Sequence, residues 1–234
     1  EGQVTTIIGL SGAGKTVLLK HIIGLLEPDE GMILFRGRPL ADMTREEASA
    51  NLSRISYVFQ NDALFDSMTV YENIAMPLAE TMSLSRAEIQ QRVMDRIDQM
   101  ELNEAAARYP SELSGGMRKR TALARALVTD PHIVLFDEPT SGQDPVRKNG
   151  ILRMIVQYQK QFRFTAVLVS HEIPDVYCIS NRILVLYERQ VIFQGTPEEL
   201  ERFDHPFQTE IRRSREELLR EVDQRGRNPC ISAQ

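Results

Sequence analysis

One short stretch near the start of the chain has the residue types and spacing of a phosphate-binding loop. It comprises Gly9, Leu10, Ser11, Gly12, Ala13, Gly14, Lys15 and Thr16, and it matches the pattern G-x-x-x-x-G-K-[ST] at every position. Glycines let the backbone curl so that several N–H groups point into one cavity, which fits a di- or triphosphate. We expect Lys15 to reach the terminal phosphates and the Thr16 hydroxyl to ligate Mg²⁺.

Two adjacent carboxylates at the end of an apolar stretch form a second candidate site. Residues 132–137 read as a buried strand that ends at Asp137, and Glu138 follows. A strand places adjacent side chains on opposite faces, but the chain turns at the strand end, so both carboxylates can serve one site. We expect Asp137 to approach Mg²⁺ through water, and Glu138 to face the attacking water of a nucleotide hydrolysis. The alternative is a solvated strand end.

A serine followed by two glycines precedes a basic helix. The sequence Leu113-Ser-Gly-Gly-Met117 places the Ser114 hydroxyl and the amides of Gly115 and Gly116 at a helix N-terminus. Unpaired N–H groups and the helix dipole favour an anion at such a position. A Ser-Gly-Gly helix start by itself is weak evidence for a site.

These residues must be positioned by an alternation of strands and helices. Such alternation indicates an α/β domain with a largely parallel sheet. The strand-like runs are residues 3–9, 31–35, 54–59, 132–137, 164–169, 182–187 and 190–194. A helix is expected over 16–26, and residues from about 62 to 128 contain no strong strand, which predicts an inserted helical lobe. Capping boxes mark helix starts at Thr44–Glu47, Thr69–Glu72, Ser85–Glu88 and Thr196–Glu199, and Asp144 caps a helix that opens with Pro145.

The bulk properties limit the classes of partner. The chain has 234 residues and a net charge of −5, so no broad polyanion-binding surface and no nucleic acid partner is expected. We expect a nucleotide-binding domain over 1–200, with the helical lobe at about 62–128, and a helical extension over 201–234. The helix of that extension is a docking or dimer-contact helix or a plain surface helix. The chain opens at Glu1 directly into the strand that feeds the loop, so we expect the start of a longer protein to be missing.

Taken together, these motifs make the chain resemble the ATP-binding cassette (ABC) ATPases, a branch of the P-loop NTPases. Six motifs stand in the family's order and cover nearly the entire chain. The matches are Gly9–Thr16 as the Walker A loop, Gln60 as the Q-loop glutamine, Leu113–Met117 as the signature, Ile133–Asp137 with Glu138 as Walker B and the catalytic glutamate, Ser141–Asp144 as the D-loop, and His171 as the switch histidine.

The resemblance implies a mechanism shared by two copies of the chain. ATP would lie between the Walker A loop of one copy and Ser114, Gly115, Gly116 and Met117 of the other, with Gln143 and Asp144 in the D-loop, so function requires a homodimer. Glu138 would polarise the water and His171 would contact the γ-phosphate. The implied cofactors are ATP and Mg²⁺, the latter near Thr16, Gln60 and Asp137. Simpler alternatives are a strand-end amide for Gln60 and a helix cap for His171.

Two departures from the common pattern narrow the resemblance. The signature ends in Met117 instead of glutamine, and the D-loop reads Gly-Gln-Asp-Pro over 142–145. Together with residues 59–73 and 110–117, these features are similar to the ATPases of Mla/Mce-type lipid transport systems of diderm bacteria. That resemblance implies phospholipid trafficking between the inner and outer membranes, driven from the cytoplasmic face of the inner membrane. The implied partners are integral membrane permease subunits and a periplasmic Mce-type lipid-binding component.

Other functions and roles stay open at this stage. The chain could energise an ABC transporter for another solute, because partner proteins choose the cargo. A non-transport ABC ATPase acting on nucleic acid or ribosomes is disfavoured by the acidic charge, and an ATP-binding switch without turnover is disfavoured by Glu138. The apolar residues after Gln60 either line a groove for a coupling helix of the permease or belong to the core. They are Phe65, Met68, Val70, Tyr71 and Ile74.

Overall fold

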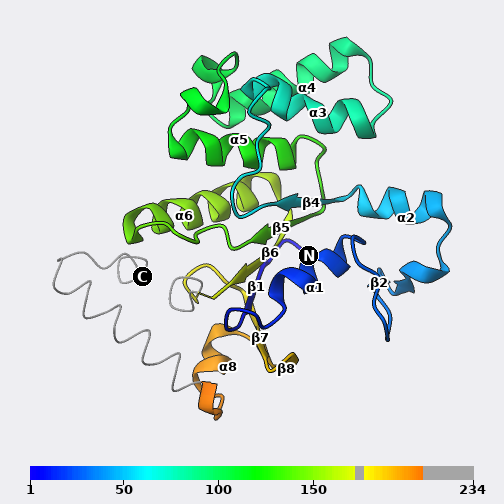
Figure 1. Cartoon of the computed structure of the whole chain (residues 1–234), viewed down its shortest axis with the longest axis vertical. Helices are drawn as coiled ribbons and strands as arrows, with labels where there is room; N and C mark the ends of the chain where they lie inside the picture. The colour runs from blue at the N-terminus through cyan, green and yellow to red at the C-terminus, as the bar shows by residue number, and fades with distance from the viewer. Residues whose placement is uncertain (172–176, 208–234) are drawn as a thin grey trace. The chain divides into compact units, whose positions relative to one another are not determined.

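The computed structural model describes residues 1–171 and 177–207 (Figure 1). These residues divide between two units. The first unit comprises Glu1–Leu18 together with the described residues from Glu138 onward. The second unit comprises Leu19–Asp137.

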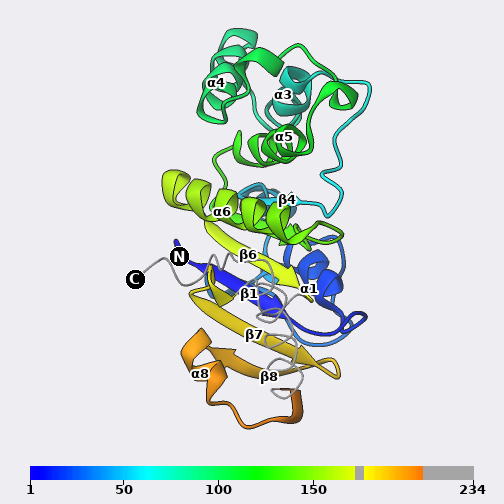
Figure 2. The ribbon, with the colours of Figure 1, turned by 90° about the vertical axis from the view of Figure 1, so that its left-hand side faces the viewer.

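The first unit is built around β1 (Val4–Ile8), the strand that leads into the glycine-rich loop. β1 pairs in parallel with β6 (Thr165–Ser170) and with β7 (Arg182–Tyr187), and β8 (Gln190–Gly195) runs antiparallel beside β7 (Figure 2). Strands inside a parallel sheet are covered on both faces and therefore read as continuous apolar runs. The four strands predicted in this unit are confirmed to within one residue at each end.

Capping side chains begin the helices of this unit. The Asp144 carboxylate accepts hydrogen bonds from two N–H groups in the first turn of α6 (Pro145–Phe162). The hydroxyl of Thr196 and the carboxylate of Glu199 form a capping box at α8 (Pro197–Glu201). Both helix starts confirm the prediction, because a cap depends on residues within one turn of each other.

In the second unit, β4 (Ile55–Val58) pairs in parallel with β5 (Ile133–Asp137). The register sets Tyr57 opposite Leu135, and Leu135 is fully buried. Both strands were predicted, at 54–59 and 132–137. With the parallel pairs of the first unit, they confirm an α/β fold whose strands are mostly parallel.

A two-stranded hairpin replaces the strand expected over 31–35. β2 covers only Leu34–Phe35 and pairs antiparallel with β3 (Arg38–Pro39), which the sequence did not predict. Arg36 and Gly37 between them have φ values of 51° and 81°. A type I′ hairpin turn requires left-handed backbone at both central residues, so the chain reverses directly after Phe35, where the predicted strand also ends. The predicted residues 31–33 do not belong to β2.

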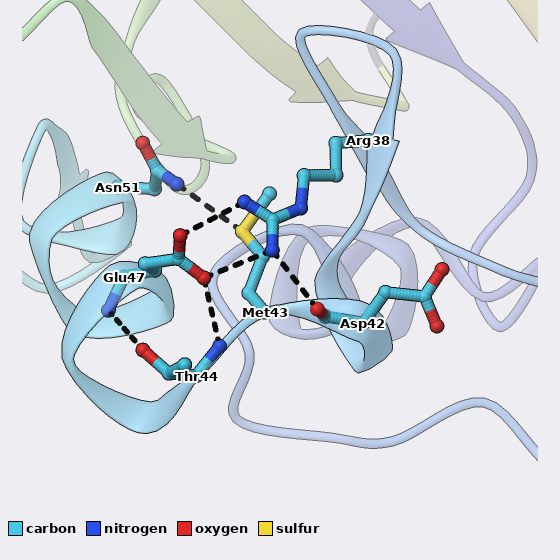
Figure 3. Close-up of polar contacts among 6 residues, drawn as sticks. All are labelled: Arg38, Asp42, Met43, Thr44, Glu47 and Asn51. Carbon is cyan, nitrogen blue, oxygen red and sulfur yellow. Dashed lines mark hydrogen bonds and ion pairs between the residues drawn. The ribbon is translucent and has the colours of Figure 1, made fainter.

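A network of hydrogen bonds ties this hairpin to the start of α2 (Arg45–Leu52) (Figure 3). Arg38 donates to both carboxylate oxygens of Glu47, at 2.9 and 3.0 Å, and to the carbonyl oxygen of Asp42. Glu47 also accepts from the N–H of Thr44, and the Thr44 hydroxyl accepts from the N–H of Glu47. The predicted capping box is thus present, and the bond from Arg38 holds the pKa of Glu47 below its ordinary value.

Residues 59–132, all of which the structure describes, contain helices but no strand. α3 packs against both α4 and α5 (Figure 1). The capping boxes predicted at Thr69 and Ser85 are present. The elements are α3 (Val70–Thr81), α4 (Arg86–Gln99), the 3₁₀ turns η2 (Asn103–Ala105) and η3 (Pro110–Glu112), and α5 (Gly115–Leu127). The domain boundaries at 1–200, 62–128 and 201–234 stay predictions.

The helix after the glycine-rich loop is shorter than predicted. α1 spans Lys15–Ile22, whereas the apolar pattern predicted a helix over 16–26. Gly24 has a φ of 71°, and the N–H groups of Leu25 and Leu26 both donate to the carbonyl oxygen of Lys20. A glycine in left-handed backbone, followed by N–H groups that donate to a carbonyl oxygen in the last helical turn, ends a helix. Pattern alone could not distinguish this stop from a continued helix, because the residues beyond it are apolar.

The residues expected to line a groove after Gln60 differ in their burial. Val70 and Ile74 are fully buried and belong to the core. Met68 and Tyr71 are half-buried, and Phe65 is 42% exposed. The helix expected in the C-terminal extension falls, beyond residue 207, outside the described residues. No helix within the described part of the chain is long and apolar enough to cross a membrane.

Candidate functional site

The glycine-rich loop joins β1 to α1, and two of its glycines are required by the backbone itself. Gly14 has a φ of 98°, which residues with a side chain rarely adopt. A Cβ on Gly9 would overlap the carbonyl oxygen of Leu186 in β7. α1 begins at Lys15 with no acidic residue in its first turn, so the positive end of the helix dipole is available to an anion. Within the loop, Leu10, Ser11 and Gly12 are exposed, and Ala13, Gly14 and Thr16 are half-buried.

The ammonium group of Lys15 is buried against the loop that precedes it. The side chain is 4% exposed, and Nζ donates to the carbonyl oxygens of Gly9 at 2.9 Å and Leu10 at 3.0 Å. Nζ also lies 3.6 Å from Oε1 of Glu138. A buried cation is stable only among such partners. Phosphate oxygens would be stronger partners still, since bonds between two charged groups are the strong ones.

Glu138 lies between Lys15 and His171. Its φ of 45° is in the left-handed region, which is uncommon for a residue with a side chain and is concentrated at functional sites. Its N–H donates to the carbonyl oxygen of Val169 in β6, and its Oε2 lies 3.2 Å from Nδ1 of His171. The structure thus brings together three residues that the sequence predicted separately.

Asp137 is held by the hydroxyl of Tyr57, a residue that sequence reasoning missed. Asp137 is 9% exposed, and its Oδ2 accepts a hydrogen bond of 2.7 Å from Tyr57. Burial, and next this bond, raise the pKa of Tyr57, which keeps the hydroxyl protonated as a donor. Tyr57 pairs with Leu135, so Asp137 lies two residues further along the same face of β5. Only the strand register could have revealed this contact.

The other oxygen donors predicted for Mg²⁺ stand at the ends of two elements. Thr16 is half-buried in the first turn of α1, and Gln60 is exposed in the turn after β4. The main-chain carbonyl of Gln60 accepts a hydrogen bond of 3.3 Å from Lys119. Among the described residues, no three His, Cys, Asp or Glu side chains gather as a metal cluster. Thr16 and Gln60 carry neutral oxygen donors, which Mg²⁺ accepts beside carboxylate.

The signature residues form the exposed start of α5. The Ser114 hydroxyl accepts a hydrogen bond from the N–H of Met117 and so caps the helix. A Cβ on Gly115 would lie 3.9 Å from Arg118, and a Cβ on Gly116 would meet no atom within 4 Å. Ser114, Gly115 and Gly116 are exposed. The second unit therefore gives no steric reason for either glycine.

The D-loop has a local role that the structure shows directly. Asp144 caps α6, and its Oδ2 also lies 3.2 Å from Nε of Arg147. Gln143 is half-buried, and its N–H donates to the carbonyl oxygen of Thr140. Capping accounts for Asp144 within the chain, and the role of Gln143 at an interface stays a prediction.

Comparisons with known proteins agree with these motifs. A family model described as ABC transporter matches residues 1–141. The intermembrane phospholipid transport system ATP-binding protein MlaF of Haemophilus influenzae is 40% identical over 200 residues, which cover 86% of this chain and 76% of that protein. The probable ribonucleotide transport ATP-binding protein mkl of Mycobacterium leprae is 38% identical over 205 residues, or 88% of this chain and 59% of that protein.

A solved structure extends the likeness to three dimensions. It is a dimeric ATP-binding cassette in a post-hydrolysis state, bound to ADP and Pi. It aligns with a TM-score of 0.70 and 30% identity, and covers 84% of this chain and 86% of its own. On the family match, the relatives and the fold, the chain belongs to the ABC transporter family, of which it is an ATP-binding subunit and an ATPase.

Proposed function

We propose that this ATPase energises the transport of phospholipid between the inner and outer membranes of a diderm bacterium. The observation that carries the proposal is the 40% identity to MlaF over 86% of the chain. The departures from the common family pattern at Met117 and at residues 142–145 favour the same branch of the family.

The site residues fit ATP and Mg²⁺. The loop amides would bind the phosphates, and Lys15, a buried cation that needs anionic partners, would bind the terminal ones. Thr16, Gln60 and Asp137 would hold Mg²⁺ through oxygen atoms, and the Asp137 carboxylate is already oriented by Tyr57. The bound ion would offset the negative charge of the phosphate under attack.

Glu138 would orient and deprotonate the attacking water. Its carboxylate is shared between Nζ of Lys15 at 3.6 Å and Nδ1 of His171 at 3.2 Å. Triphosphate would compete with Glu138 for Lys15. Once Lys15 turns to the phosphates, an oxygen of Glu138 becomes available to accept a proton from water. His171 would keep the carboxylate in place and would contact the γ-phosphate.

A second copy of the chain would complete each nucleotide site. The exposed Ser114, Gly115 and Gly116 offer a hydroxyl and main-chain amides that can approach phosphate closely, because no side chain obstructs the glycines. Gln143 and Asp144 would lie at the same interface. A related cassette was solved as a dimer with ADP and Pi.

The partners follow from the proposed system. ATP hydrolysis by the ATPase dimer would drive integral membrane permease subunits. A periplasmic Mce-type component would bind lipid on the periplasmic side of the permease. The chain would then act at the cytoplasmic face of the inner membrane.

Hydrolysis is tested with Glu138→Gln in the full-length protein, purified with its membrane partners. We expect ATP binding to be kept and turnover to fall by about 10²–10⁴-fold, the contribution of a general base. Glu104→Gln, at an exposed glutamate outside the site, is the matched control. Wild-type turnover in Glu138→Gln would reject the assignment of the base.

The cargo is tested by mass spectrometry of the complex isolated from its native membrane. Co-purified permease, bound phospholipid and ATP-dependent lipid transfer between vesicles are the expected results. The similarity to mkl makes ribonucleotide, as an example of another solute, the competing cargo. ATP-dependent ribonucleotide uptake without lipid transfer would favour that alternative.

A further inference from the structure

The segment that follows Gln60 contains two strained residues in succession. Asp62 and Ala63 have φ values of 62° and 46°. Left-handed backbone is uncommon for residues other than glycine, and alanine has no polar side chain with which to stabilise it. Such conformations persist only where the surrounding structure holds them.

Lys119 of helix α5 holds this segment through Asp62. Its Nζ lies 2.8 Å from Oδ1 of Asp62, and it also donates to the carbonyl oxygen of Gln60 at 3.3 Å. The Lys119 and Asp62 side chains are only 13% and 14% exposed. Water and salt therefore screen this ion pair less than they screen a surface pair.

Arg125 of the same helix holds the carbonyl oxygens of both strained residues. Its two terminal nitrogens donate to Asp62 at 2.9 Å and to Ala63 at 2.8 Å. The guanidinium carbon lies 5.8 Å from the centre of the Phe65 ring. A planar guanidinium has fixed donor directions, so it restrains the two peptide groups together.

The helix that supplies both cations begins at the signature serine. Lys119 and Arg125 stand about one and a half and three turns beyond Ser114. Between them, Ala122, Leu123 and Ala124 are almost completely buried, which fixes the helix in the core of this unit. A displacement of the segment after Gln60 would therefore have to break the polar contacts with Lys119 and Arg125 or carry α5 with it.

We propose that Asp62, Lys119 and Arg125 form a clamp that makes Gln60 and Ser114 respond to nucleotide together. This inference rests on the proposed roles of Gln60 and Ser114 in ATP hydrolysis. Asp62, Lys119 and Arg125 are positioning residues. They act through the backbone of the segment and through α5, so their loss should lower the rate of hydrolysis more than the affinity for ATP.

The test compares Asp62→Asn, Lys119→Met and the double variant in the full-length protein with its membrane partners. Asn tolerates left-handed backbone, so Asp62→Asn removes the charge with little change in conformation. Lys119→Arg keeps the cation. Arg120→Met is the matched control, because Arg120 is an α5 cation whose contacts are with Met100 and Glu101 instead.

The measured quantities are kcat, the KM for ATP and the thermal midpoint. We expect each single substitution to lower kcat by about tenfold, within the range of coupling between contacting residues, with KM and midpoint little changed. The double variant should be no slower than the slower single variant, and Lys119→Arg should restore most of the rate. Arg120→Met should keep the wild-type kcat.

Three results would overturn the clamp. The first is an unchanged kcat in both single variants, and the second is a double variant whose loss is the product of the single losses. The third is a loss of kcat that follows the thermal midpoint in every variant, Arg120→Met included. The proposed function is judged separately, since turnover by the wild type and its loss in Glu138→Gln do not depend on the clamp.

Discussion

Replacing Tyr57 with phenylalanine tests how Asp137 is prepared for Mg²⁺. The substitution removes one hydroxyl and keeps the ring, which contacts Phe59 with centroids 4.6 Å apart. What is lost is the 2.7 Å hydrogen bond to Oδ2 of Asp137. Asp137 keeps its charge and its place at the end of β5, but its carboxylate loses the donor that restricts its rotation.

The size of the effect follows from that single bond. A hydrogen bond to a charged group contributes about 1.5–3 kcal/mol. Tyr57 is half-buried, so water can replace part of the bond, and the loss of stability should lie near or below the lower end of this range. Every 1.4 kcal/mol is tenfold in an equilibrium constant, so, where this free energy serves to orient Asp137 for the ion, the Mg²⁺ concentration required should rise by up to about tenfold. Loss of outer-shell partners commonly weakens metal binding by about 10- to 100-fold.

Two measurements report the metal directly. The Mg²⁺ concentration for half-maximal ATP hydrolysis should rise in Tyr57→Phe, while kcat at saturating Mg²⁺ stays close to that of the wild type. Mn²⁺ binding can be measured by electron paramagnetic resonance in the presence of a non-hydrolysable ATP analogue, so that no turnover occurs. The affinity for Mn²⁺ should fall by a similar factor. Tyr109→Phe removes a hydroxyl from a side chain that is 45% exposed and is the matched control.

The result that would refute this reasoning is specific to the metal. If Tyr57→Phe binds Mn²⁺ as tightly as the wild type and hydrolyses ATP at the same Mg²⁺ concentration, the hydroxyl does not position Asp137 for the ion. A lowered thermal midpoint alone would then assign the bond to the packing of β4 on β5.

Three further predictions concern the interface, the loop and acid stability. Ser114→Arg should leave ATP binding to the isolated chain unchanged but abolish turnover, and measurable turnover in the assembled complex would contradict a site shared by two copies. Gly14→Ala should destabilise the fold by about 1–2 kcal/mol in chemical denaturation, because alanine is strained at a positive φ. The N–H of Thr69, followed by its hydroxyl, holds the pKa of Glu72 below 4.5. This contribution to stability is present above pH 4.5 and is lost as the pH falls through the lower folded-state pKa. In Glu72→Gln, the thermal midpoint should therefore fall less steeply than in the wild type as the pH is lowered. An unchanged slope would argue against this contribution.

Local chemistry explains which parts of the fold could be predicted from the sequence. The capping box at Thr69 depends on a hydroxyl and a carboxylate within one helical turn, and the bonds that the sequence predicts are present. Strands such as β1 and β7 are continuous apolar runs between polar ends, so their bounds could be read to within one residue. The early stop of α1 was missed because Gly24 adopts left-handed backbone among apolar neighbours.

The site was predictable where a residue type performs the chemistry, and not where a contact depends on tertiary structure. Lys15, Glu138 and His171 were each identified from their motifs, and the structure adds that one carboxylate contacts the other two side chains. Tyr57 and Lys119 carry no motif. Their contacts arise from the register of β4 on β5 and from the packing of α5, which a single sequence does not reveal.

The glycines of the loop before α1 and those at the start of α5 differ in whether the fold of the chain itself requires them. Gly9 and Gly14 are required within the chain, one by a neighbouring carbonyl oxygen and the other by a positive φ. Gly115 and Gly116 have neither constraint, and glycine inside a helix is less stable than alanine by about 0.5–1 kcal/mol. The chain keeps these two glycines at an exposed helix start where its own packing would accept a larger residue. Their small size fits the proposed approach of phosphates from a nucleotide held by a second copy, because the amides at this helix start favour negative charge.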